Sequence, residues 1–524
     1  MSKHYDCNSS LNEKILSGVA KLADNVAATY GPRGRNVLLQ SAGRPPVITK
    51  DGVTVAKFIE LEDPFENAGA QVIKQSAIQT NSDAGDGTTT ATILSRAILD
   101  QSQKYLSAGA SPVELKRGMD RALDAVVENL KQEATPISSQ EDIAHIATIS
   151  ANGDNTIGSL IAMAVDQVGK NGAITVEEAR SLKTTLDVSE GFQINSGYIS
   201  PAFVTDERRG AARYADAFVL VTDKKIETVD AMLPVLELVS RSSRPLVIVA
   251  EEIEGQALAA LIMNSMRGTL KVAAVKAPRY GEERRQILRD LATVVGATFV
   301  SVETGKQLND LKLTDLGTAN TIEITKHATT FVDGGGDTEE VEKRVDELKA
   351  DFETIDETDL HACERLQERI TRLASGVAII RVGAATEIEM IEKKHRIEDA
   401  LEAVRSAQQE GIVPGGGVAL IRAVQNLKVD TTTEDQDLGV KIIRDAAYAP
   451  LRQMATNAGE SADLIIDKVC GEIGNNGYDF SSKKITNLVT AGVIDPVKVT
   501  RCALQNAVSV ASTLITTNHA VIEV

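Results

Sequence analysis

Hydrophobic residues recur with a helical period along the first part of the chain. In the segment 11–29 they follow one another every three or four positions, and Gly31 and Pro32 end the predicted helix. The same pattern predicts helices at 69–81, 88–107, 112–132, 139–149 and 155–168. Short β-branched runs predict strands at 36–40, 46–50 and 173–176.

Between about residues 191 and 300 the pattern changes. Apolar β-branched runs at 217–221, 245–250, 270–275 and 297–302 alternate with helical segments at 229–240, 255–267 and 282–295. Strands that alternate with helices of this length predict a parallel sheet with right-handed crossovers. Long amphipathic helices return after residue 376, so this α/β domain is expected to interrupt a helical one.

A charged helical segment, 339–374, lies between the α/β pattern and the long amphipathic helices that follow residue 376. Its apolar residues step by three and four and then repeat after a polar break near 356–359. We predict an antiparallel helix pair that covers one face of the α/β domain.

Composition excludes several classes of function. The chain has 524 residues, which predicts about three domains, and a net charge of −18, which argues against nonspecific nucleic-acid binding and against anionic membranes. The longest apolar runs are far too short to span a membrane. Neither a secretory signal nor a transit peptide is indicated at the N-terminus. The four cysteines form no metal-ligand motif, so we predict a reducing, cytoplasmic location.

The most informative motif lies at 83–92. Two glycines flank Asp86, and Thr88, Thr89 and Thr90 open a predicted helix. A helix N-terminus offers unpaired N–H groups and a positive dipole end to phosphate, and a carboxylate offers a hard oxygen to Mg²⁺. Local chemistry leaves open the alternative of a polar cap on an ordinary helix.

Other motifs are weaker by themselves. Walker A, GxGxxG, GxSxG and HExxH patterns are absent from the sequence, and the six histidines are scattered. The glycines at 415–417 are consistent with a ligand contact or with a flexible connector, and 50–52 with a turn. Asp399 lies off the apolar stripe of its predicted helix, which by itself indicates a solvated position.

Six segments together resemble the group I chaperonins of the Hsp60 type. They are 50–53, 60–67, 83–92, 273–278, 415–423 and 495–501. The resemblance covers nearly the whole chain in order and without large gaps. It implies a multidomain α and α/β fold: a helical equatorial ATP-binding domain, a small intermediate hinge domain and an α/β apical substrate-binding domain. The implied bounds are 1–132 and 410–524, 133–189 and 378–409, and 190–377, respectively.

The resemblance also implies a function. Members of this family are ATPases that enclose non-native proteins in a ring cavity and promote their folding. The implied ligands are ATP and Mg²⁺, with K⁺ as a further candidate. The implied partners are further copies of the chain in a seven-membered ring, single or double, a co-chaperonin of the Hsp10 type and non-native client proteins. The alternative is a ring-forming binding or structural protein whose ATPase is weak or has decayed.

Site residues follow from the same resemblance. Asp399 matches the carboxylate that positions the attacking water, Asp51 lies across the site as a second catalytic carboxylate, and Asp86 falls where the family holds Mg²⁺. The residues that match the nucleotide site are Thr29, Tyr30, Gly31, Pro32, Lys50, Asp86, Gly87, Thr88, Thr89, Thr90, Gly416, Asp479, Phe480, Ser481 and Asp495. The residues that match the substrate-binding surface are Tyr198, Phe203, Leu233, Leu236, Leu258, Ile262 and Met263. For the five that lie on predicted helices, Leu233, Leu236, Leu258, Ile262 and Met263, the helical spacing alone would indicate core packing.

One departure from the family pattern bears on assembly. Arg452 is retained, but Ser461 stands where family members usually place an acidic partner from the opposite ring. We therefore expect a weakened contact between rings.

Overall fold

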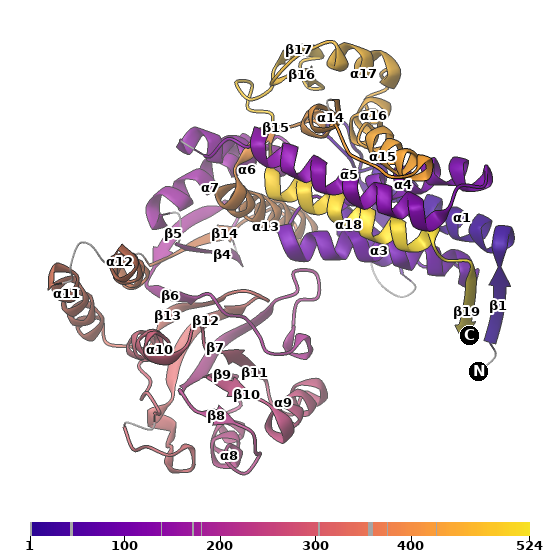
Figure 1. Ribbon diagram of the computed structural model, residues 1–524. Helices are drawn as coiled ribbons and strands as arrows, with labels where there is room; N and C mark the ends of the chain where they lie inside the picture. Colours follow the sequence, from indigo (N-terminus) through magenta and orange to yellow (C-terminus); the bar gives the residue numbers. More distant parts are fainter. Residues whose placement is uncertain are drawn as a thin grey trace. The chain divides into compact units, whose positions relative to one another are not determined.

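The chain folds into two compact units. The computed structural model describes residues 3–41, 46–137, 139–169, 172–179, 181–301, 304–354, 360–374, 376–425 and 427–523. The helical unit comprises Met1–Met163, Glu178–Lys183 and Val382–Val524, and the α/β unit comprises Ala164–Glu177 and Thr184–Arg381 (Figure 1). The chain thus leaves the helical unit and returns to it, as the sequence predicts. The finer division into three domains with a separate hinge stays a prediction.

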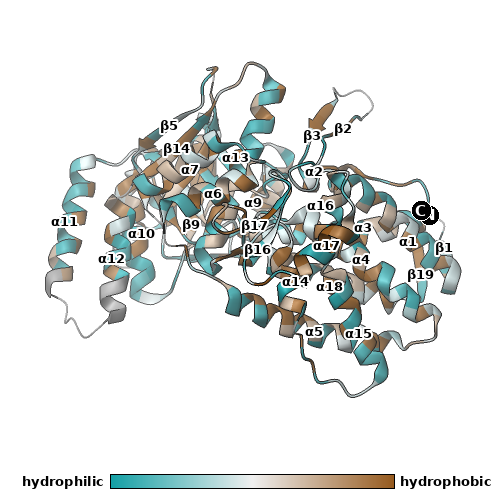
Figure 2. Ribbon diagram, turned by 90° about the horizontal axis from the view of Figure 1, so that it is seen from above, coloured by the Kyte–Doolittle hydropathy of each residue, from teal (hydrophilic) through white to brown (hydrophobic). Residues whose placement is uncertain are grey.

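Long amphipathic helices build the helical unit. In Figure 2 they carry separate hydrophobic and hydrophilic sides, and their apolar sides form one core that α1, α3, α4, α5, α15 and α18 share. The helices are α1 (Asn8–Ala27), α2 (Gly52–Phe58), α3 (Pro64–Ala84), α4 (Thr88–Ser107), α5 (Pro112–Glu133), α6 (Gln140–Ser150), α7 (Asn155–Val168), α13 (Glu387–Glu410), α14 (Val418–Gln425), α15 (Glu434–Ala446), α16 (Ala449–Asn457), α17 (Ala462–Cys470) and α18 (Val497–Ile515). The last five residues of α7 belong to the α/β unit.

Short antiparallel pairs of strands complete the helical unit. The two ends of the chain pair with each other, β1 (Lys3–Cys7) with β19 (His519–Glu523) (Figure 1). The other pairs are β2 (Val37–Leu39) with β3 (Val47–Thr49), β15 (Ile412–Pro414) with β18 (Ile494–Pro496), and β16 (Asn476–Asp479) with β17 (Lys484–Asn487). The first of these confirms the predicted hairpin near residues 36–50.

Most predicted helices of this unit are present, but two boundaries differ. The helix expected at 69–81 begins earlier, because Asp63 accepts hydrogen bonds from the N–H groups of Phe65 and Glu66 and Pro64 occupies the first turn. The turn expected at 50–52 is instead the start of α2, capped by Asp51.

The α/β unit is built on a six-stranded sheet of order β11-β9-β7-β12-β13-β6. Its strands are β6 (Gly191–Ile194), β7 (Ala212–Val221), β9 (Leu246–Ala250), β11 (Val272–Lys276), β12 (Gly317–Ile324) and β13 (Thr329–Gly334). The predicted parallel pairing is correct for β11, β9 and β7 only. The other half is antiparallel, because β12 and β13 are joined by a short turn, which cannot connect parallel neighbours. The strand predicted at 297–302 is wrong: among its described residues only Val300 forms a bridge, with Thr222.

Helices and two smaller sheets surround this sheet. The helices are α8 (Leu233–Ser242), α9 (Gly255–Arg267), α10 (Gly281–Val295), α11 (Thr338–Thr354) and α12 (Leu360–Ala374), and Pro201–Phe203 forms a 3₁₀ turn. The small sheets are β4 (Ala173–Glu178), β14 (Val377–Val382) and β5 (Thr185–Ser189), and the parallel pair β8 (Lys225–Ile226) and β10 (Glu252–Ile253). The predicted helix pair is confirmed in α11 and α12, although its expected break near 356–359 lies outside the described residues. Among the helices in the described part of the chain, none has the length and apolar character needed to cross a bilayer.

Candidate functional site

Two glycines shape the junction between α3 and α4. Gly85 ends α3 and Gly87 precedes α4, both with positive φ angles, 72° and 82°. No side chain caps the first turn of α4. Its N–H groups therefore remain available, at the positive end of a twenty-residue helix. The motif predicted to bind phosphate thus has the backbone geometry that such binding needs.

A third glycine brings α2 against the same turn. A Cβ atom at Gly52 would lie 2.3 Å from the Thr89 hydroxyl oxygen and 3.0 Å from that of Thr88. Only glycine permits this approach. The preceding Asp51 carboxylate accepts hydrogen bonds from the N–H groups of Val53 and Thr54, at 3.1 Å each. The structure therefore fixes Asp51 beside the first turn of α4.

Carboxylates accumulate at this junction. Asp86 accepts a hydrogen bond from the Ser150 hydroxyl at 3.1 Å, and burial, together with the charge of Asp51, raises its pKa. Burial raises the pKa of Asp495 to about 7, and the charge of Asp86 contributes to that shift. The charge of Asp51 thus acts on Asp86, and that of Asp86 on Asp495, in the direction that a bound cation would offset.

The described side chains do not by themselves complete a metal site. Within the described ranges, no three His, Cys, Asp or Glu side chains form a group that could hold a metal ion. Mg²⁺ typically takes one or two protein carboxylates and completes its shell with phosphate oxygens and water. The hard oxygens of Asp86 and Asp495, next to an N-terminus suited to phosphate, fit that pattern.

Asp399 is half-buried on α13. Seven residues further along α13, and so on the same face, the Ser406 hydroxyl donates a hydrogen bond of 2.9 Å to the Ala84 carbonyl oxygen. On that face too, Glu402 lies so near Gly85 that a Cβ atom there would be 2.2 Å from the Cβ of Glu402. Sequence periodicity by itself indicates a solvated carboxylate at Asp399, whereas in the structure Asp399 is half-buried on the face of α13 that meets the end of α3.

The turn after α1 is held from two sides. Lys50 donates hydrogen bonds to the Gly31 carbonyl oxygen at 3.1 Å and to the side-chain oxygen of Asn152 at 3.0 Å. The Thr90 hydroxyl donates to the Tyr30 hydroxyl at 3.1 Å. The contact between Thr90 and Tyr30 joins the segment 29–32 to the first turn of α4. Thr29, by contrast, is buried and donates to its own helix, so its side chain is not presented to a ligand.

The glycine-rich turn before α14 lies next to Asp495. A Cβ atom at Gly415 would be 3.1 Å from a carboxylate oxygen of Asp495, and the strand pairing places Val413 opposite Asp495. Gly416 has a φ of 65°, and a Cβ atom there would have no neighbour closer than 3.9 Å. The turn therefore leaves room above its backbone, as a ligand contact requires.

One assignment near 479–481 needs correction. The Phe480 side chain is 4% exposed and packs edge-to-face on Tyr478, with ring centroids 5.0 Å apart. Asp479 accepts hydrogen bonds from the N–H groups of Ser481 and Ser482 at 2.8 and 3.2 Å. The Phe480 ring belongs to a small core, so only its main chain could line a nucleotide site.

Sequence reasoning missed several residues that hold the site. Asn457 donates hydrogen bonds to the carbonyl oxygens of Ala27 and Tyr30, at 2.8 and 2.9 Å. Ser150 binds Asp86, and Asn152 binds Lys50. Single polar residues near helix ends carry no sequence signal that distinguishes them from ordinary caps, so only the fold identifies them.

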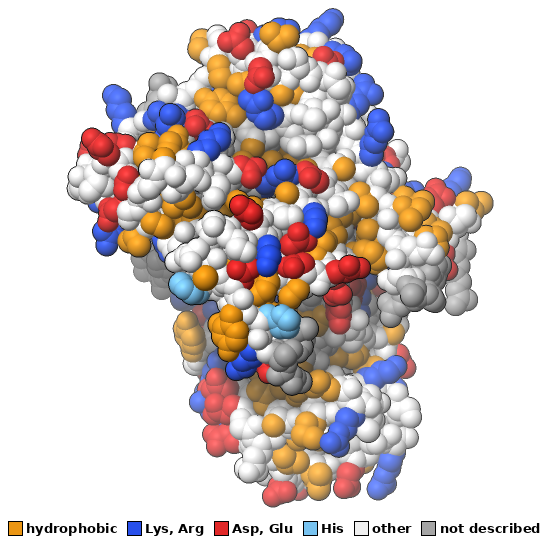
Figure 3. Space-filling view, turned by 90° about the vertical axis from the view of Figure 1, so that its right-hand side faces the viewer, with side chains coloured by type: hydrophobic (Ala, Val, Ile, Leu, Met, Phe, Trp, Pro, Cys, Tyr) orange, Lys and Arg blue, Asp and Glu red, His pale blue; other side chains and the backbone are white. Residues whose placement is uncertain are grey.

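The predicted apolar surface is partly exposed. Leu233 and Met263 are 46% and 49% exposed on α8 and α9, and Met266, which the sequence analysis missed, is 75% exposed. Orange side chains occur in the lower part of Figure 3, the part of the molecule that includes α8 and α9. The half-buried members of the predicted surface, which also pack on the core, are Tyr198, Leu236, Leu258 and Ile262.

Phe203 does not belong to that surface. It is completely buried, in the 3₁₀ turn that packs beneath α9, and its carbonyl oxygen accepts a hydrogen bond of 3.4 Å from the Tyr214 hydroxyl. The residues of the predicted surface on α8 and α9 are also apolar, but they are at least partly exposed. Phe203 is therefore a core residue that supports α9.

Comparison with known proteins points to one family. The model of the TCP-1/cpn60 chaperonin family matches residues 22–524. Among solved structures, the chain is similar to the chaperonin gp146 from bacteriophage EL 2 (Pseudomonas aeruginosa), determined in the presence of ATP-BeFx. The TM-score is 0.67 with 21% sequence identity, and the match covers 99% of each chain. At 21% sequence identity, the similarity to this structure supports the fold alone.

The raised pKa of Asp495 predicts a pH-dependent stability. Because the folded-state pKa of about 7 exceeds the unfolded-state value of 3.8, the free energy of unfolding falls as pH rises through this interval. Asp495→Asn removes this loss of stability, because an asparagine side chain does not ionise. In EDTA and without nucleotide, we expect the thermal midpoint of the variant to gain on the wild type between pH 5 and pH 8.

The exposed variant Asp124→Asn on α5 serves as the control for this measurement. Its midpoint should keep a constant difference from the wild type over the same pH range. A constant difference for Asp495→Asn as well would refute the assignment of a raised pKa to this carboxyl.

Proposed function

The chain belongs to the TCP-1/cpn60 chaperonin family of ATP-dependent chaperones, and we propose that the α3–α4 junction is its ATPase site. The observation that supports this proposal is the convergence of an uncapped helix N-terminus with Asp51, Asp86 and Asp495. The alternative, a ring-forming protein with a decayed ATPase, is not favoured, because these carboxylates and Asp399 are all present.

Different segments of the site would bind the phosphates, the rest of the nucleotide and Mg²⁺. The N–H groups of the first turn of α4 would receive the phosphate oxygens, and the Thr88, Thr89 and Thr90 hydroxyls lie beside them. The turns at 29–32 and 415–417 would line the rest of the nucleotide, since the first is joined to α4 by the contact between Tyr30 and Thr90 and the second leaves room above Gly416. Asp86, with Asp495 close by, would hold Mg²⁺, which when bound neutralises phosphate charge.

Hydrolysis of ATP requires a positioned water molecule. Asp399 would accept a hydrogen bond from that water and so orient its oxygen toward the γ-phosphate. Asp51 is held by the N–H groups of α2 and keeps its carboxylate fixed across the site. Phosphoryl transfer depends on positioning and charge stabilisation, so no covalent nucleophile from the protein is needed.

Asp399→Ala tests this division of roles. We expect ATP binding to stay nearly intact and the turnover rate to fall by about 10² or more, because the lost interaction acts mainly in the transition state. Asp86→Ala should instead weaken metal-dependent ATP binding. Steady-state phosphate release and equilibrium nucleotide binding measure the two effects.

A matched control is Asp120→Ala, which removes an exposed carboxylate on α5. It should change neither binding nor turnover. Wild-type hydrolysis by Asp399→Ala would remove Asp399 from the mechanism.

We further propose that the exposed faces of α8 and α9 capture non-native proteins. These helices present Leu233, Met263 and Met266 to solvent, with Leu236 and Leu258 half-buried beside them. An exposed apolar patch on a soluble chain is an aggregation liability unless it has a partner. Unfolded chains fit this patch because they share exposed apolar area rather than a sequence.

Leu258→Ser and Leu236→Ser test the capture surface. Each should abolish binding of a denatured client while ATP turnover stays at the wild-type level, because the substitutions remove apolar contact area within the α/β unit. Co-sedimentation with a chemically denatured protein measures capture, and a thermal melt measures folding.

The core residue Phe203 provides the contrast. Phe203→Ser should lower the thermal midpoint, since a Phe-to-small substitution in a core costs about 3–5 kcal/mol. If Leu236→Ser and Leu258→Ser lower the midpoint as much as Phe203→Ser does, these leucines serve the core and the proposed surface is wrong.

Assembly into rings follows from the family, and we propose that the contact between rings is weak. Arg452 forms an ion pair of 2.8 Å with Asp463 of its own chain, and both side chains are at least half exposed. Ser461 is exposed at the start of α17 and carries no charge. A seven-membered ring and an Hsp10-type co-chaperonin remain predictions from the family resemblance.

Ser461→Glu should strengthen the association of rings. One exposed ion pair contributes only about 0.2–1 kcal/mol, but a ring repeats the contact in every subunit. We expect wild-type single rings, or double rings that separate readily, and more double rings in the variant. Analytical ultracentrifugation at several ionic strengths, with and without ATP, measures the distribution. Wild-type double rings that persist under all these conditions would contradict the proposal.

A further inference from the structure

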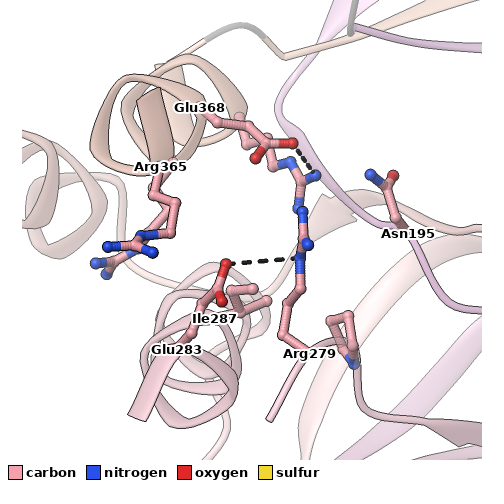
Figure 4. A pocket seen from close by; sticks show the side chains of 9 residues that line it. Asn195, Arg279, Glu283, Ile287, Arg365 and Glu368 are labelled. Atoms are coloured by element: carbon pink, nitrogen blue, oxygen red, sulfur yellow. Dashed lines mark hydrogen bonds and ion pairs between the residues drawn. The ribbon is translucent and has the colours of Figure 1, made fainter. Parts of the chain in front are cut away.

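A cavity rich in arginine lies between α10 and α12 of the α/β unit. It has a volume of about 250 Å³, and four arginines line it against two glutamates, so the lining carries a net charge of +2. Figure 4 shows Arg365 and Glu368 on α12, Glu283 on α10, and Arg279 on the loop before α10. This cavity lies outside the residues assigned to ATP and to client capture.

Two of the arginines are held in place by their neighbours. Arg369 is 9% exposed and donates to both carboxylate oxygens of Asp290, at 2.8 and 2.9 Å. Asp290 also accepts a hydrogen bond of 3.0 Å from Arg344. Arg344 also pairs with Glu347 at 2.9 Å, so Asp290 and Glu347 together balance the two guanidinium groups and hold Arg369 in place. Arg372 is fixed by Glu368 at 2.6 Å.

The other two arginines retain donor capacity. Arg365 is exposed and has no hydrogen-bond or ion-pair partner among the side chains that the structure describes. Arg279 lies 3.5 Å from Glu283, which is a weak ion pair. Its φ of 62° is a left-handed conformation that non-glycine residues rarely adopt. Such backbone strain is concentrated at ligand clamps and other functional sites.

We propose that this cavity binds a small, multiply charged oxyanion, such as a phosphate or a polycarboxylate. Planar guanidinium groups present paired donors that match the oxygens of both ligand classes. Inorganic phosphate fits easily within 250 Å³, and a second hollow of about 530 Å³ shares Asn195, Pro278 and Arg279 with the first. The adjoining hollow leaves room for a larger group attached to the anion.

Calorimetric titration of the full chain with inorganic phosphate tests the proposal. The protein is first saturated with a non-hydrolysable ATP analogue and Mg²⁺, so that the γ-phosphate position of the proposed nucleotide site is filled, and ionic strength is held constant with NaCl. We expect saturable binding, weakened about tenfold by Arg365→Gln and by Arg279→Gln, because each removes a charged donor. A parallel titration with citrate identifies whether phosphate or carboxylate ligands bind more tightly.

The matched control is Arg267→Gln, which removes an exposed arginine of the same unit at the end of α9. It should leave the dissociation constant unchanged. Three results would overturn the proposal: neither anion binds, all three variants weaken binding equally, or Arg365→Gln disturbs only the assembly of subunits. The last result would make the cavity a contact between copies. None of these outcomes depends on ATP hydrolysis, so a failure here is distinguishable from a failure of the ATPase assignment.

Discussion

The close approach of the first turns of α2 and α4 is the constraint on which the candidate site depends. Gly52 permits it, since any larger residue would collide with the Thr89 hydroxyl. The approach brings Asp51 near Asp86, and burial, with a contribution from the charge of Asp51, raises the pKa of Asp86. The folded chain thus retains unfavourable electrostatic energy at a site where a cation and a phosphate group would relieve it. This is the expected condition of a binding site, in which function is favoured at a cost to stability.

The chemistry of the site was visible in the sequence, but its framework was not. The glycines and threonines at 85–90 predict a phosphate-binding turn because those residue types have few other reasons to occur together. The turn at 50–52 proved to be a capped helix start, and Asn457 reaches the turn after α1 from more than 400 residues away in sequence. Asp399 shows the same limit: periodicity places it off the apolar stripe, yet Ser406 shows that its face of α13 meets α3.

The fold was predictable where local pattern decides the structure. Helical periodicity identified most helices of the helical unit, and the return of long helices after residue 376 revealed the insertion of the α/β unit. The parallel direction of β7, β9 and β11 was predicted correctly, but the antiparallel strands β12 and β13, which complete the sheet as a hairpin, were not predicted. Phe203 is a comparable case, since an aromatic residue near an apolar surface reads the same whether its ring points outward or into the core.

The central claim is that the carboxylates at the α3–α4 junction are balanced by a metal–nucleotide complex. Calorimetric titration of preformed Mg²⁺-ATP at pH 7, in two buffers of different ionisation enthalpy, tests it most directly. Because the pKa of Asp495 is about 7 in the free protein, binding of the cation should release protons from the chain. The account predicts net proton release in the wild type and less release in Asp495→Asn. Tight binding without any proton release would contradict it.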